Sequence, residues 1–147
     1  MIRARVANIW RRAGLINSKD YYARAAAILR FIQRKCVYVH EPIETFTRPR
    51  RMIGSWSRGL WWLFGDCDEF TSVEEALFQS AGFPTQREAI GWSDHFAHVY
   101  AVVGLPPGGR AVERWLCADG TVNKPLGWSP LRWLRRRKSG IVVMRRR

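Results

Sequence analysis

The spacing of apolar residues changes once along this chain, and the change restricts the folds that it can adopt. As far as Gly82, apolar residues recur every three to four positions, which is typical of one face of a helix. After Pro84 they alternate with polar residues, which is typical of strands. Helices followed by an antiparallel sheet indicate an α+β fold. The pattern predicts helices over residues 2–13, 19–34 and 66–81, and strands over residues 37–39, 85–92, 96–103, 111–118 and 140–144.

Short sequence signals mark the boundaries of these elements. Ser18 suits the N-cap of the second helix, and Asp66 with Glu69 three residues later forms a capping-box pattern for the third. Prolines and glycines interrupt residues 43–64, so this segment is predicted to be irregular. A chain of 147 residues has the usual length of one domain, so we expect a single domain over residues 1–147.

The cysteines and the apolar runs bear on where such a chain would be found. Its three cysteines have no regular spacing, which argues against a disulfide framework and against a structural zinc site. No secretory signal follows Met1, and no apolar run approaches the ~20 residues that span a bilayer. We therefore expect a soluble protein made in the cytoplasm, which cell lysis or packaging in a virion would export without leaving a trace in the sequence.

Positive charge is concentrated near the C-terminus. Lys and Arg number 25 against 12 acids, a net charge of +13, and the segment from about residue 128 to residue 147 has no acid. This basic segment is interpreted either as a contact for a polyanion (nucleic acid, cell-wall polymer or an acidic partner subunit) or as a solubilising terminus, and the nearby Trp133 and Leu134 favour contact. Its cations are Arg132, Arg135, Arg136, Arg137, Lys138, Arg145, Arg146 and Arg147.

Cys67 is the residue whose position most suggests chemistry. It falls in the first turn of the predicted third helix, where unpaired backbone N–H groups stabilise a thiolate. Cys36 and Cys117 lie in apolar stretches and are interpreted as small core residues. Because five acids between residues 66 and 75 oppose a thiolate, a histidine cation would be needed beside Cys67.

His98 and Asp119 are the candidates for its partners. His98 lies in one predicted strand and Asp119 ends the next, so two adjacent antiparallel strands can present them side by side. A cysteine and a histidine oriented by a third polar group form the activated nucleophile of thiol hydrolases. A structural histidine, held only by hydrogen bonds, is the alternative.

Three separated motifs resemble those of the transglutaminase-like superfamily, in the order and spacing found there. The nucleophile helix of the family resembles Gly65-Asp66-Cys67-Asp68-Glu69-Phe70, followed by Ala76-Leu77 and Ala81-Gly82-Phe83-Pro84. Its histidine and aspartate strands resemble His98-Val99-Tyr100 and Trp115-Leu116-Cys117-Ala118-Asp119-Gly120-Thr121. The compact layout is most similar to the short bacterial and phage cysteine-proteinase branch.

The resemblance implies a papain-like fold with Cys67 as nucleophile, His98 as base and Asp119 as orienting acid. It implies no cofactor, and the spacing of Cys67, His95 and His98 does not resemble a metal site. His95 is either a second polar group in the cleft or a turn residue. The oxyanion-hole partner is not marked: Trp61 is the candidate, with Trp56 and Trp62 as alternatives.

Two function classes follow from these observations. The first is a peptidase or amidase that forms a thioester on Cys67, with transfer to an amine ranked below hydrolysis. The second is a non-enzymatic phage virion or assembly component that retains the fold and docks through its basic segments. A peptide or protein is the expected substrate of the first class. Reaction of Cys67 with a small electrophile at neutral pH would distinguish them.

Overall fold

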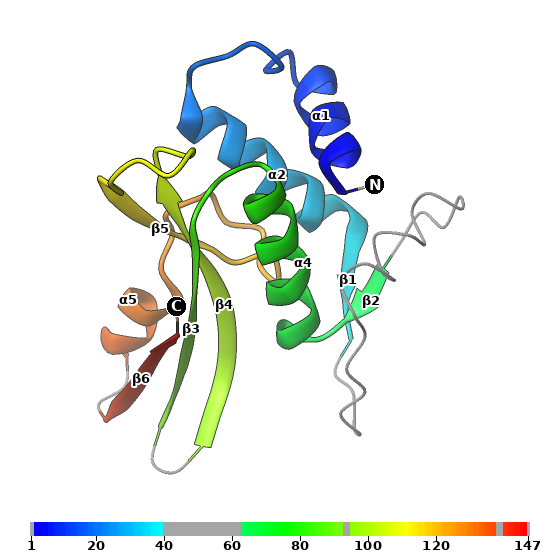
Figure 1. Cartoon of the computed structure of the whole chain (residues 1–147). Helices are drawn as coiled ribbons and strands as arrows, with labels where there is room; N and C mark the ends of the chain where they lie inside the picture. Colours follow the sequence, from blue (N-terminus) through cyan, green and yellow to red (C-terminus); the bar gives the residue numbers. More distant parts are fainter. Residues whose placement is uncertain (1, 40–62, 93–94, 138–139, 147) are drawn as a thin grey trace.

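The computed structural model describes residues 2–39, 63–92, 95–137 and 140–146 (Figure 1). Three helices lie on one side of a four-stranded sheet, and a short fourth helix lies on the other. The predicted α+β class is confirmed. The elements are α1 (Ile2–Arg12), α2 (Tyr21–Lys35), β1 (Cys36–Tyr38), β2 (Leu63–Gly65), α4 (Cys67–Ser80), β3 (Thr85–Trp92), β4 (His95–Leu105), β5 (Arg114–Ala118), α5 (Pro130–Arg135) and β6 (Ile141–Arg146).

The start of α2 differs from the prediction. Asp20, and not Ser18, is the N-cap, because its side chain accepts a hydrogen bond from the Ala23 N–H at 2.8 Å. The Ser18 hydroxyl instead accepts from the Asp20 N–H at 3.1 Å, so it holds the residue that caps the helix. No helix in the described parts of the chain is long and apolar enough to cross a bilayer.

The main sheet has the order β5-β4-β3-β6, and every neighbouring pair is antiparallel. The predicted strand near residues 140–144 is confirmed as β6, so part of the basic C-terminal segment is built into the sheet. β5 begins at Arg114 rather than residue 111, because Gly108 and Gly109 with positive φ extend the preceding turn. Pairing between β4 and β5 ends at Ala101 opposite Ala118, which leaves residues 95–100 of β4 beyond the end of β5.

A second, smaller sheet joins two segments on either side of residues 40–62. β1 and β2 pair in parallel, with Tyr38 opposite Gly65. The prediction of irregular structure over residues 43–64 is therefore wrong for its last two residues, which form a strand because they pair with β1; the earlier part lies outside the described residues. The pairing of β2 with β1 fixes the direction in which the chain enters α4.

Apolar side chains form two clusters, one on each face of the main sheet. The larger cluster lies between the sheet and α1, α2 and α4, and includes Phe70, Phe78 and Val103. The smaller cluster lies under α5 and joins Leu131 to Ile90, Tyr100 and Val102. The sequence analysis missed α5, although Ser129 is its N-cap and Pro130 its first residue. Two covered faces explain why β3 and β4 are largely buried.

Candidate active site

Cys67 is the first residue of α4, as the capping pattern predicts. The Asp66 carboxylate accepts hydrogen bonds from the N–H groups of Asp68 (3.0 Å) and Glu69 (3.5 Å), and the Glu69 carboxylate accepts one from the Asp66 N–H (3.1 Å). Gly65 permits this box, because a Cβ there would lie 2.6 Å from a Glu69 carboxylate oxygen. The half-buried Cys67 is thus fixed at the positive end of the α4 dipole.

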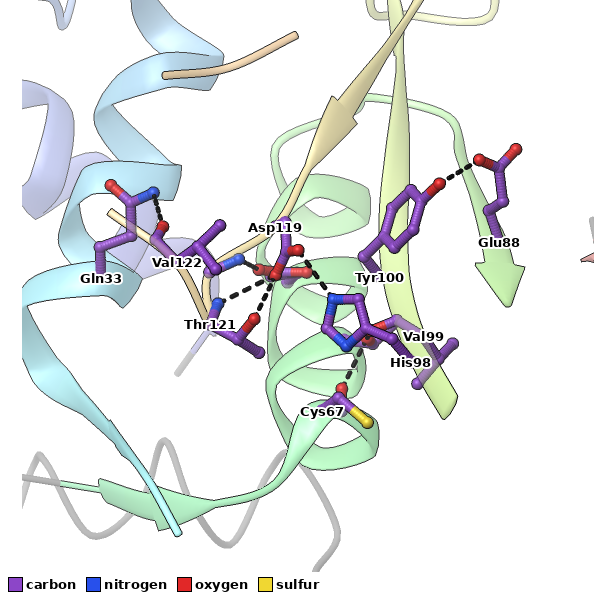
Figure 2. Close-up of polar contacts among 12 residues, drawn as sticks. Gln33, Cys67, Glu88, His98, Val99, Tyr100, Asp119, Thr121 and Val122 are labelled. Atoms are coloured by element: carbon purple, nitrogen blue, oxygen red, sulfur yellow. Dashed lines mark hydrogen bonds and ion pairs between the residues drawn. The ribbon is translucent and has the colours of Figure 1, made fainter. Parts of the chain in front are cut away.

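A threonine connects this first turn to β4. The Thr71 hydroxyl lies 2.7 Å from the Cys67 carbonyl oxygen and 3.2 Å from that of Val99. Val99 follows His98 in the part of β4 that extends beyond β5. The N-terminal turn of α4 can therefore approach β4 there, and Figure 2 shows Cys67 and His98 side by side.

Asp119 lies on the other side of the His98 ring (Figure 2), where its Oδ2 atom is 2.8 Å from His98 Nε2. Its second oxygen accepts from the Thr121 N–H (3.1 Å) and the Thr121 hydroxyl (2.6 Å). The Asp119 side chain is only 2% exposed. It follows the last residue of β5, so the contact with His98 depends on the turn that Thr121 stabilises as well as on strand pairing.

The surroundings of His98 favour its protonated form. Burial alone would lower the pKa of His98, but hydrogen bonds to Asp119 and Cys67 and the negative charges of both raise it to about 10. Because Nε2 faces Asp119, the ring's other nitrogen remains for the sulfur. The arrangement can hold an imidazolium between a carboxylate and a thiolate.

Glu74 is a buried carboxyl group that the sequence analysis did not single out as a site residue. It is 1% exposed and accepts a hydrogen bond from the Gly120 N–H, next to Asp119. Burial and the charge of Asp119 raise the pKa of Glu74 well above its ordinary value, although N–H donors at Gly120 and Ala101 act in the opposite direction. Gly120 allows this approach, since a Cβ there would lie 2.4 Å from Glu74 Oε1. Glu74 thus packs α4 against the residue after Asp119, and burial favours its neutral form.

A cleft of about 400 Å³ opens beside His98. Its walls are mostly apolar and aromatic, and it lies between β1, the ends of β3 and β4, and α5. Trp92 and Tyr38 both line it. The pKa of Tyr38 is raised by burial and then by the negative charges of Cys67, Asp66 and Asp119, which places it near the thiol. The walls include Tyr38, Trp92, Val122, Pro130, Trp133 and Leu134.

The remaining candidates fall in different places. Cys36 is buried in the larger core, and Cys117 is half-buried against the smaller one. His95 begins β4 opposite Trp92, so it is a strand residue and not a turn residue. Trp61, Trp56 and Trp62 lie outside the described residues. Within residues 2–39, 63–92, 95–137 and 140–146, no three His, Cys, Asp or Glu side chains gather as metal ligands would.

A second polar cluster adjoins the first. Glu88, 4% exposed, accepts hydrogen bonds from the Tyr100 hydroxyl and from Arg145 Nε. The rings of Tyr100 and His98 lie 5.7 Å apart between centroids. The sequence analysis missed this Glu88 cluster, although the alternation of β3 places Glu88 on the same face as the buried Ile90.

The fold is similar to that of a solved structure. No protein-family model and no curated protein sequence matches this chain. The solved structure of a candidate cysteine protease from Cytophaga hutchinsonii is similar with a TM-score of 0.54 and 14% sequence identity. The match covers 97% of this chain and 46% of that protein, so this chain spans about half the length of the similar structure. At this identity the likeness shows a shared fold.

Proposed function

We propose that the chain is a thiol hydrolase, a peptidase or amidase that acts through a thioester on Cys67. The observation that carries this proposal is the position of the His98 ring, which is hydrogen-bonded to the Asp119 carboxylate and lies near enough to the Cys67 side chain for that group to raise the pKa of His98. The fold shared with a candidate cysteine protease supports the same class of reaction. The three motifs that resemble the transglutaminase-like superfamily support the more specific assignment.

Each residue then has one task in the reaction. The Cys67 thiolate attacks the carbonyl carbon of an amide, and the carbonyl electrons move onto its oxygen. His98 gives its proton to the leaving amine as the carbon–nitrogen bond breaks, which leaves a thioester on Cys67. His98 then takes a proton from water, and the resulting hydroxide attacks the thioester carbon. The carbon–sulfur bond breaks, so the acid leaves and the Cys67 thiolate and the His98 imidazolium are restored. Asp119 keeps the ring oriented and stabilises its positive charge throughout.

The developing oxyanion needs hydrogen-bond donors. The Cys67 N–H is one of the unpaired donors at the start of α4, since the Asp66 side chain accepts from the next two residues. Trp61 remains the proposed second donor. The apolar cleft beside His98 favours substrates with an apolar or aromatic group near the scissile bond.

The alternative function, a phage virion or assembly component that docks through basic segments, requires no accessible thiol. Exposed arginines on and after α5 (Arg132, Arg135, Arg136 and Arg137) support contact with a polyanion or an acidic subunit. Cys67 is half-buried, and its neighbour His98 lines an open cleft, which favours the enzyme. Formation of an acyl-enzyme therefore decides between these classes.

The test is acylation by p-nitrophenyl acetate. We expect a burst of one equivalent of nitrophenolate per chain, and an acetyl group on Cys67 in a peptide map. Cys67→Ala should abolish the burst, whereas the matched variant Cys117→Ala should retain it. A burst that survives in Cys67→Ala would place the nucleophile elsewhere and contradict the proposal.

A further inference from the structure

Helices α1 and α2 carry an unusual concentration of positive charge. Each contains four basic residues, and neither contains an acid. One of the eight, Arg24, is held over the Trp10 ring and within reach of the Ser18 carbonyl oxygen, so it belongs to the packing of the two helices. The others include side chains that lie around a single groove on the surface.

This groove has a volume of about 510 Å³ and lies between α1 and α2. No acidic residue lines it in the described part of the chain, and none of its residues lines the cleft beside His98. Apolar and aromatic side chains, among them Ile9, Ala27 and Phe31, also contribute to its surface. Five cations surround them: Arg5, Arg12, Arg30, Arg34 and Lys35.

The shape of the groove fits a narrow, extended anion. Its lining residues on α2 run from Ala23 to Lys35, which is about 18 Å at 1.5 Å per residue. The axes of two packed helices commonly lie about 8–10 Å apart, so the recess between them is too narrow for a nucleic-acid duplex. The recess is also concave, so it does not fit the flat surface of a bilayer. Arginine forks bind phosphate oxygens in pairs, and Arg12, Arg30 and Arg34 are exposed along the groove.

We propose that the groove between α1 and α2 binds single-stranded nucleic acid, with the exposed arginines Arg12, Arg30 and Arg34 on its phosphates. The charge of the groove, its width and its length each match this ligand. The inference does not depend on the thiol chemistry, because the groove and the cleft have no residue in common.

The test measures anisotropy of a fluorescein-labelled ten-nucleotide oligothymidylate between 50 and 200 mM KCl. The double variant Arg30→Gln/Arg34→Gln removes two exposed cations of the groove. The matched control, Arg135→Gln/Arg136→Gln, removes two exposed cations at the end of α5. We expect the groove pair to weaken binding at 50 mM KCl about tenfold and to reduce the logarithmic salt slope by about 1.4, which is about 0.7 for each phosphate that the protein no longer neutralises. The α5 pair should change affinity less than about threefold.

Two results would overturn the proposal. The first is that both double variants weaken oligonucleotide binding equally, which would mean that general positive charge binds it, or that the α5 pair alone weakens binding, which would mean that the C-terminal segment binds it. The second is binding of a ten-residue polyglutamate, or of vesicles with one fifth phosphatidylglycerol, as tightly as the oligonucleotide. Unchanged melting temperatures of both double variants, and the unchanged nitrophenyl acetate burst, serve as controls for folding.

Discussion

Asp119 and Glu88 are both buried acids that contact an aromatic ring of β4, and their surroundings differ in one decisive respect. Both oxygens of Glu88 are occupied, one by the Tyr100 hydroxyl and one by the exposed Arg145. Asp119 contacts His98, whose ring also reaches the Cys67 side chain. The Glu88 cluster therefore ends in a phenol and a surface cation, whereas the Asp119 contact leads to a histidine that lines an open cleft and lies next to a thiol.

The difference shows why burial of a carboxylate does not by itself indicate a functional site. Glu88 and Asp119 are equally exposed, at 4% each, and each is fully hydrogen-bonded. What separates them is the partner: a histidine can serve as general acid and base in a reaction, while the Tyr100 phenol and the Arg145 guanidinium are held in one protonation state. Substitutions of matching residues in the two clusters should therefore affect different properties of the protein.

The largest difference is expected between the two neighbouring rings of β4. His98→Ala should reduce kcat/KM for ester hydrolysis by roughly 10³-fold or more, because it removes the proton carrier and the cation beside Cys67. Tyr100→Phe removes only a hydroxyl that contacts Glu88, so kcat/KM should stay within about threefold of the parent. Steady-state kinetics on a nitrophenyl ester measures both. A comparable reduction of kcat/KM in Tyr100→Phe would mean that the two clusters act as one site.

A second contrast compares the two acids. Asp119→Asn should reduce kcat/KM by about 10²-fold, because an amide cannot stabilise the His98 imidazolium and favours the wrong tautomer. Glu88→Gln should lower the free energy of unfolding by about 2–3 kcal/mol while the folded enzyme stays active, because it loses a buried charged partner of Arg145. Urea unfolding and ester kinetics on both variants give the comparison. Full activity in Asp119→Asn would remove Asp119 from the mechanism.

A smaller effect is expected in the pH dependence of stability. The pKa of folded His98, about 10, lies above its ordinary 6.5, so the stability that it contributes is fully present below about pH 6.5 and is lost as pH rises through 10. The stability difference between the parent and His98→Gln should therefore decrease steadily between pH 6.5 and pH 10. For Tyr100→Phe the difference should stay constant up to pH 9, since burial raises the pKa of Tyr100 above its ordinary value.

Urea unfolding followed by tryptophan fluorescence at pH 6.5, 7.5, 9 and 10 would show both trends. If the difference for His98→Gln does not change with pH, His98 is neutral in the folded protein.

The sequence predicted those parts of the site that depend on local signals. Asp66 and Glu69 form the predicted capping box, and the alternation of apolar residues located the strands that carry His98 and lead to Asp119. The contact of Asp119 with His98 was predicted from neighbouring strands. The turn at Thr121 that completes it leaves no periodic signal, because it lies beyond β5.

The features that the sequence did not reveal depend on contacts between distant segments. β2 is only three residues long and forms because β1 lies beside it, so no local pattern distinguishes it from a loop. Glu74 and Glu88 were missed because a glutamate in an amphipathic helix or a strand usually faces solvent. Their partners, Gly120 and Arg145, follow 46 and 57 residues later.

The most direct test of the account compares the three cysteines by alkylation of the folded protein with iodoacetamide at pH 6.5, followed by peptide mapping. Burial raises the pKa of Cys36 to about 12 and also raises that of Cys117, so both should react slowly as neutral thiols. Cys67, beside the His98 imidazolium, should react at least roughly a hundred times faster, and His98→Gln should remove most of that advantage. Equal rates at the three cysteines, or a Cys67 rate that is unchanged in His98→Gln, would contradict an activated thiol at the start of α4.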